Sequence, residues 1–175
     1  MMNGCVVTQR IRLSRPLLAG LFLLAVTGTT SVSANPFLCC RSGPTVAAAI
    51  SQVPPIQAGL ARVWLLRQFE PSETLTSPMI SANGAPVRQS EPGTAFIRDI
   101  RPGTYTFTVP SYGVDTGQAA TVQLAPGTQT YLEVQSLRSW AEFSQTGQRD
   151  TLYVRAISPY WAEKYFPALT YLGQG

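Results

Sequence analysis

Residues 104–109 read Thr-Tyr-Thr-Phe-Thr-Val, an unbroken alternation of threonine with a larger apolar residue. Successive side chains of a β-strand point to opposite faces, so this pattern predicts a strand with Tyr105, Phe107 and Val109 inside and the threonines toward water. Three later segments repeat the alternation more weakly. They are 120–124, 132–134 and 152–156. The fold is therefore expected to contain several half-buried strands.

Turn sequences separate these segments. Three x-Pro-Gly-Thr motifs place proline and glycine at the two central positions of a type II turn, where proline presets a negative φ and glycine supplies a positive one. The motifs are 91–94, 101–104 and 125–128. Asn83-Gly84 is the dipeptide preferred in two-residue hairpin turns, and it predicts a hairpin between strands 79–82 and 85–89.

The stretch 61–69 is different, because its middle is apolar on both alternations. It predicts a central strand that is covered on both faces, ended by Pro71. Arg67 on this strand is expected at the rim or in an ion pair.

The C-terminal residues predict a short helix. Ser158 can cap it, Pro159 suits its first turn, and Pro167 should break it after about two turns. Apolar side chains follow at helical spacing and should dock on the strands; these are Trp161, Ala162, Tyr165 and Phe166, with Leu169 and Leu172 carrying the stripe onward. We predict an all-β fold, an immunoglobulin-like or prealbumin-like β-sandwich of about seven to nine short antiparallel strands with a short C-terminal helix.

The N-terminal residues resemble a secretory signal. Basic residues in 10–15 precede an apolar run of eleven at 16–26, and Val32-Ser33-Ala34 provides a small-residue cleavage site. We predict a signal peptide over 1–34, a Pro-rich flexible tether over 35–59 with one helical turn at 45–52, and the folded domain over 60–175. Export to the bacterial periplasm follows, and an uncleaved anchor facing the periplasm is the alternative.

Charge and composition exclude several functions. The formal charge of +4 comes largely from three arginines of the signal, and its removal leaves ten scattered basic residues against nine acidic ones. Nucleic-acid binding needs clustered cations, so we expect none. The chain contains no histidine, which removes Ser-His-Asp and Cys-His catalysis and His-ligated metals.

The carboxylates sit on predicted loops. Glu70 and Glu73 are the closest pair, Asp99 and Asp115 flank other turns, and we interpret all four as solvated charges. We assign no catalytic, cofactor-binding or metal-binding residue. Lys164, the only lysine, is expected on the wet side of the terminal helix.

Cys39 and Cys40 are adjacent, which disfavours a disulfide between them. Three interpretations stay open: lipidation of Cys39, cross-linking to another chain, or an incidental pair in the tether. Leu38 in front of Cys39 is a poor lipidation context.

Aromatic residues concentrate near the C-terminus, with eight of seventeen after position 139. Four of them form the candidate ligand surface. They are Trp140, Tyr160, Trp161 and Tyr165. Exposed Trp and Tyr can bind sugars or peptides. The alternative, which we favour, is that these side chains pack the helix against the sheet.

Four stretches together resemble a bacterial family of unknown function, domain-of-unknown-function family 2846, and are also similar to PEGA-type and transthyretin-like modules. They are 61–67, the hairpin at Asn83-Gly84, 100–105 and 124–131. The similarity covers about residues 60–140. It implies a sandwich on the outer side of a bacterial inner membrane, often in a lipoprotein, with no established catalytic residues.

The sequence therefore predicts a non-enzymatic exported β-sandwich that binds or scaffolds a cell-envelope component. A glycan- or peptide-binding module using the C-terminal aromatics is the alternative, and a carboxylate-only hydrolase is a third. The partner would be an envelope protein or a glycan, without nucleic acid or cofactor. Membrane association is expected only through an uncleaved signal or lipidation.

Overall fold

The computed structural model describes residues 43–69, 76–111, 117–138 and 150–175. Within them lie nine strands, two short α-helices and two 3-10 turns. The strands are β1 Ala61–Arg67, β2 Met79–Ala82, β3 Ala85–Gln89, β4 Thr94–Ile100, β5 Gly103–Thr108, β6 Ala120–Leu124, β7 Gln129–Arg138, β8 Asp150–Ile157 and β9 Thr170–Gln174. The helical elements are α1 Val46–Ala49, η2 Ile50–Gln52, α2 Pro159–Tyr165 and η4 Phe166–Ala168.

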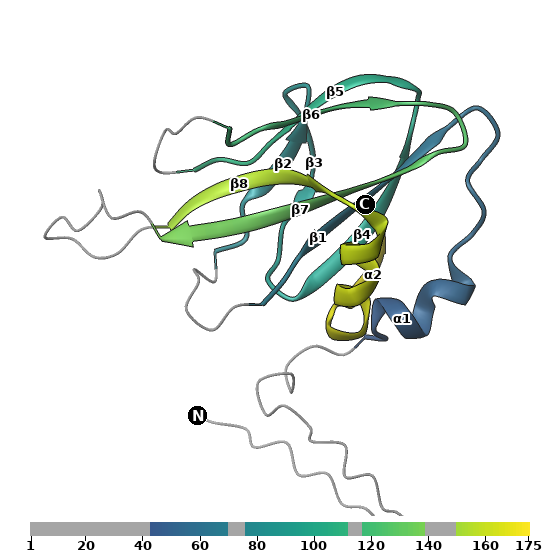
Figure 1. Ribbon diagram of the computed structural model, residues 1–175, viewed down its shortest axis with the longest axis horizontal. Coiled ribbons are helices and arrows are strands. Elements are labelled where there is room, and N and C mark those ends of the chain that lie inside the picture. The colour runs from purple at the N-terminus through teal and green to yellow at the C-terminus, as the bar shows by residue number, and fades with distance from the viewer. Residues whose placement is uncertain (1–42, 70–75, 112–116, 139–149) are drawn as a thin grey trace, which may run out of the picture. The chain divides into compact units, whose positions relative to one another are not determined.

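The strands form two sheets. A five-stranded sheet has the order β8-β7-β1-β4-β9 and a four-stranded sheet the order β3-β2-β5-β6. Figure 1 shows them as two layers, with α1 and α2 on the side of the five-stranded sheet. The prediction of an all-β sandwich with a short C-terminal helix is confirmed.

Two strand pairs are parallel, which differs from the predicted all-antiparallel arrangement. β1 pairs with β7 and β4 pairs with β9 in parallel. In the first case the chain forms β2 and β3, then β4 on the other side of β1, and then β5 and β6 before it returns beside β1. In the second, α2 carries the chain across the outer face of the five-stranded sheet, so that β9 runs in the direction of β4.

The space between the sheets holds the main apolar core. Phe107 is 1% exposed, Val109 is buried and Tyr105 packs against the same cluster, while Thr104 and Thr108 face water. Burying a side chain such as Phe107 contributes about 2–3 kcal/mol. The alternation in residues 104–109 is therefore confirmed as an inside-outside pattern.

The turns follow the predicted chemistry with one exception. Asn83 and Gly84 have φ of 49° and 81°, as a type I′ hairpin requires, and Gly93 and Gly127 both have φ of 73°. Gly103 has φ of 151° because it already belongs to β5, so the second Pro-Gly motif does not form the predicted type II turn.

Asn83 also joins two strands. Its backbone N–H donates to Thr106 O at 2.9 Å, its side-chain Oδ1 accepts from Thr106 N at 2.8 Å, and its Nδ2 donates to Thr104 O at 3.2 Å. The side chain thus substitutes for a peptide group and lengthens the short ladder between β2 and β5.

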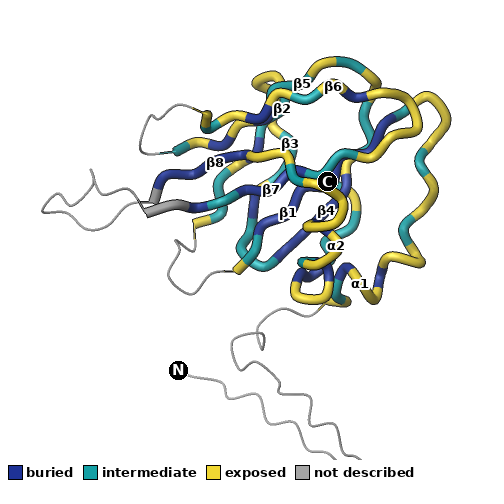
Figure 2. The backbone as a smooth tube through the Cα atoms, in the orientation of Figure 1, coloured by how far each residue is buried: buried dark blue, intermediate teal, exposed yellow. Residues whose placement is uncertain are grey.

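β1 is buried on both faces, as predicted for a central strand (Figure 2). Trp64 and Leu66 point away from the other sheet and pack in a second cluster under the helices. Arg67 is 1% exposed and donates to Thr76 O and Ser90 O at 2.6 and 3.0 Å. The expectation that it lies at the rim was wrong, and the alternative expectation of an ion pair stays a prediction. A guanidinium inside the sandwich is tolerated because backbone carbonyls accept hydrogen bonds from it.

Part of the predicted tether packs on the domain. Thr45 caps α1 by accepting from Ala48 N at 3.2 Å, and Val46 is fully buried in the second cluster. Helix α2 ends at Tyr165, just before η4 with its Pro167, as expected. The apolar stripe predicted to continue through Leu169 and Leu172 instead leads into strand β9, which the sequence pattern did not predict.

Candidate functional site

Helix α2 is held against the five-stranded sheet by one face. Ser158 is its N-cap residue, and Ser158 O accepts from Trp161 N and Ala162 N at 3.1 and 3.2 Å. Ala162 is fully buried, and Phe166 lies just beyond the helix with its ring 5.1 Å from that of Trp64. Because this face is anchored, the opposite face of α2 must point to solvent.

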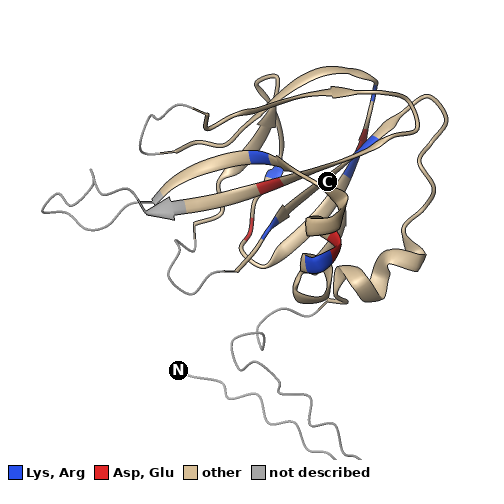
Figure 3. Cartoon of the chain, in the orientation of Figure 1, with Lys and Arg blue, Asp and Glu red and all other residues tan. Residues whose placement is uncertain are grey.

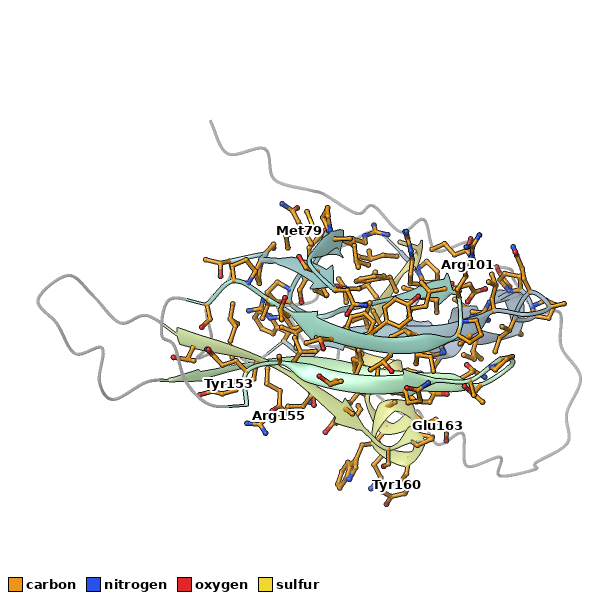
Figure 4. The ribbon with its side chains drawn as sticks, turned by 90° about the horizontal axis from the view of Figure 1, so that it is seen from above. Met79, Arg101, Tyr153, Arg155, Tyr160 and Glu163 are labelled. Atoms are coloured by element: carbon orange, nitrogen blue, oxygen red, sulfur yellow. The ribbon has the colours of Figure 1, made fainter. Side chains whose placement is uncertain are left out.

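That opposite face exposes two large aromatic side chains. Tyr160 is 60% exposed and Trp161 is 49% exposed, and Figure 2 shows part of α2 in the colour of exposed residues. Their ring centroids are 5.4 Å apart with an interplanar angle of 71°. Trp161 is also stacked on Tyr165, at 6.3 Å and 27°. Figure 4 shows Tyr160 on the outer side of α2.

Lys164 completes this group. Its Nζ lies 4.4 Å from the ring centroid of Tyr160 and 4.9 Å from that of Trp161. Residues three and four positions apart meet on a helix surface, and a cation over an aromatic face is attracted to it. We call Tyr160, Trp161, Lys164 and Tyr165 the α2 aromatic surface.

The structure divides the predicted aromatic candidates. Tyr160 and Trp161 are exposed together, so the prediction that Trp161 docks on the strands, and the favoured interpretation that both rings pack against the sheet, were wrong. Tyr165, in contrast, is half-buried and packs against the second cluster. Trp140 lies outside the described residues, as do Cys39 and Cys40. The predicted exposure of Lys164 is confirmed, but its contact with both rings was missed, although its spacing from Tyr160 and Trp161 could have indicated it.

One predicted loop charge is instead buried in an ion pair. Asp99 lies on β4 opposite Arg62 of β1. Arg62 Nε and Nη2 donate to the two carboxylate oxygens of Asp99 at 2.7 Å each, and the side chains are only 3% and 5% exposed. Arg62 Nη1 donates to Pro54 O at 2.7 Å. The solvated interpretation of Asp99 was wrong, because strand register places it beside a cation.

This pair affects the protonation of Arg62. Hydrogen bonding to Asp99 raises the pKa of the Arg62 guanidinium, burial acts in the opposite direction, and the charge of Asp99 adds to the increase. Arg62 therefore stays charged across ordinary pH. It ties the segment before β1 to the sheet and leaves Asp99 committed to a structural contact.

Glu133 on β7 is a second buried carboxylate, with 2% exposure. Gln68 Nε2 donates to its Oε1 at 2.6 Å and Gln135 Nε2 to its Oε2 at 2.9 Å. Both oxygens are thus satisfied by amides, which compensates part of the cost of burying a charge. Sequence reasoning missed this residue because it stands in a strand pattern. Glu70, Glu73 and Asp115 lie outside the described residues.

Charged residues are sparse on the sandwich, and α2 carries an acidic and a basic residue side by side, Glu163 and Lys164 (Figure 3). In the part of the chain that the structure describes, no helix has the length and apolar character needed to cross a membrane. A comparison with protein-family models and with curated proteins found no match for this chain.

Proposed function

We propose that this chain is an exported, non-enzymatic β-sandwich that binds or scaffolds a component of the bacterial cell envelope, with the α2 aromatic surface as its contact. The observation that carries the proposal is the exposure of Tyr160 and Trp161 on a helix that is otherwise firmly docked. Large aromatic side chains are usually at least partly buried, and neighbouring exposed ones mark interaction surfaces.

Export is supported by the N-terminal sequence. The basic residues, the apolar run 16–26 and the small residues at 32–34 have the order of a secretory signal. The periplasm is the corresponding compartment for a bacterial chain. The resemblance of 60–140 to a family of envelope proteins agrees with this location.

A non-enzymatic role is supported by the state of the two buried carboxylates, Asp99 and Glu133. Asp99 is engaged by Arg62, and both oxygens of Glu133 accept from amides. General acid-base chemistry needs a carboxyl that can reach a substrate proton, and neither of these groups is accessible. The chain offers no histidine as a substitute.

The proposal is tested with the chain starting at Asn35, which contains both buried clusters and every described strand. We expect it to sediment with purified envelope fragments, and Tyr160→Ser/Trp161→Ser to weaken this at least about tenfold. Met79→Ser is the matched control, since Met79 is 38% exposed and lies on the other side of the sandwich (Figure 4).

Equal sedimentation of the double variant and the control would show that the α2 aromatic surface is not the contact. A broad hydrolase screen checks the other half of the proposal. Turnover that disappears on substitution of an Asp or Glu would make the protein an enzyme.

A glycan- or peptide-binding module is a second candidate, favoured by the same exposed Tyr160 and Trp161. Aromatic rings stack on the apolar faces of sugars. A glycan array and a peptidoglycan pull-down should then report binding that Trp161→Ala removes. Binding unchanged by Trp161→Ala would dismiss this candidate.

A further inference from the structure

The chain joins the folded domain on its helical side. Tyr171 N donates to Pro44 O at 2.9 Å, Thr45 forms a bridge with Thr170, and Val46 N donates to Leu169 O at 2.8 Å. These contacts hold the first described residues against β9 and the end of η4. Helix α1 contacts η4, which directly follows α2. The first described residues therefore lie on the helical side of the domain.

The same side carries most of the exposed large apolar residues. Five such side chains are more than a third exposed in the described part of the chain, and three of them belong to helical elements. These three are Ile50 in η2 and Tyr160 and Trp161 in α2. Met79, on β2, projects from the opposite side of the sandwich in Figure 4.

The chemistry of the α2 aromatic surface fits a lipid headgroup region. Tyr and Trp have an apolar body and a polar edge and gather where hydrocarbon meets water. Lys164 is exposed and holds its ammonium beside both rings, and a lysine on such a surface can extend its long stem toward phosphates.

The same geometry is less suited to a sugar. Stacking on a pyranose needs a free aromatic face, but Lys164 Nζ lies over both rings at 4.4 and 4.9 Å. Tyr160 and Trp161 also meet at 71°, so they do not form one flat platform. A lipid headgroup layer has no such requirement for coplanar rings.

Two features of the sequence before Gly43 could attach the chain to a membrane close to the helical side. Cys39 is four residues before Gly43, so a group attached there lies no more than about 14 Å from the helical side. The apolar run 16–26 ends seventeen residues before Gly43. Either feature would hold this side near a membrane and raise the effective concentration of headgroups around α2.

We propose that the helical side lies against the phospholipid headgroup layer, with Tyr160 and Trp161 at headgroup level and Lys164 directed toward the phosphates. The inference rests on the proposed function and names its envelope component as lipid. It differs from attachment through the N-terminal residues alone, because it makes the folded domain itself a membrane contact.

Tryptophan quenching tests this in the full chain. The protein is combined with vesicles of phosphatidylethanolamine and phosphatidylglycerol, with and without phosphatidylcholine brominated near the headgroup. Residues 1–42 contain no tryptophan, and Trp64 is only 1% exposed. We expect quenching in the natural chain and loss of most of it in Trp161→Phe. Trp140→Phe is the matched control and should keep the quenching.

Each outcome decides the question. Loss of quenching in Trp161→Phe with retention in Trp140→Phe supports the inference. Quenching that Trp161→Phe leaves unchanged, or no quenching at all, overturns it. Sedimentation with insoluble peptidoglycan separates the two proposals: Trp161-dependent sedimentation without quenching keeps the proposed function and removes the lipid contact. Neither quenching nor sedimentation removes both.

Discussion

The two sheets of the sandwich differ in what lies on their outer faces. On the five-stranded sheet, Trp64, Leu66 and Ile97 are buried under α1 and α2. On the four-stranded sheet, the outer positions of β5 and β6 are threonines and a glutamine, with Thr106 Oγ1 2.9 Å from Thr121 Oγ1 and Thr104 hydrogen-bonded to Gln123. Within the described residues, no helix covers this face (Figure 1).

This difference follows from the sequences of the strands. A strand with apolar residues on both alternations needs two covers, and a strand that alternates with threonine needs only one. The helices are therefore required for stability on the first sheet, while the second sheet uses hydrogen bonds between side chains at little gain. The exposed aromatic side chains of α2 cover neither sheet, so the stability of the fold does not explain them. For this reason the functional proposal is based on them.

The largest expected loss of stability comes from removing a large side chain between the five-stranded sheet and its helices. Trp64→Ala removes the side chain that meets Phe166, Tyr131 and Tyr171, and it should lower the free energy of unfolding by about 4 kcal/mol. Thr106→Ala on the other sheet should stay within about 0.5 kcal/mol. Urea unfolding measures both, and similar losses would contradict the contrast between the faces.

The buried ion pair should follow in size. Asp99→Leu leaves Arg62 charged and buried, and we expect a loss of about 3 kcal/mol. Arg62→Met/Asp99→Leu should lose much less than the two single substitutions together, since no unpaired charge remains. A double-mutant cycle in urea gives the coupling. Additive losses would mean that the two side chains do not stabilise each other.

A smaller effect is expected on the uncovered sheet. Asn83→Asp keeps the acceptor for Thr106 N but removes the donor to Thr104 O, and an exposed hydrogen bond of this kind is worth about 1 kcal/mol or less. Asn83→Gly keeps the positive φ and removes both bonds, so it serves as the comparison. A larger loss for Asp than for Gly would assign the effect to charge rather than to the bond.

The smallest effect concerns alkaline pH. Burial raises the pKa of Tyr131, with a contribution from Glu163, and burial also raises the pKa of Tyr171. A raised phenol pKa means that the unfolded chain loses its proton first. Stability is therefore full below about pH 10, the ordinary tyrosine value, and declines above it. Tyr131→Phe should flatten the decline in urea midpoints between about pH 9 and 11, and a steeper decline would oppose this assignment.

Much of the fold could be predicted because it depends on local patterns. The alternation in 104–109, the Asn83-Gly84 hairpin and the double-sided apolar middle of 61–69 each specify a strand or turn without reference to distant residues. Ser158, Pro159 and Pro167 delimit the helix in the same way. These elements were expected from sequence and are found where expected.

What could not be predicted depends on register between distant strands. Asp99 is indistinguishable from a loop charge until β1 and β4 are paired and place it beside Arg62. The sequence of β9 shows no clear alternation of apolar and polar residues. The spacing of Leu169 and Leu172 fits a helix equally well, so the strand could not be recognised. The exposure of Tyr160 and Trp161, against the burial of Phe166, depends on which face of α2 docks, and spacing alone did not decide it.

The late position of β9 has a consequence for the order of assembly. β4 is complete at Ile100, but its neighbour in the sheet begins at Thr170 and is itself held by Thr45 near the other end of the sequence. β1 can pair with one edge of β4 early, but a chain still emerging from the ribosome cannot close the other edge until β9 is made. Until then the open edge of β4 presents unpaired backbone groups, which makes the unfinished chain more prone to pair with other chains than the finished domain.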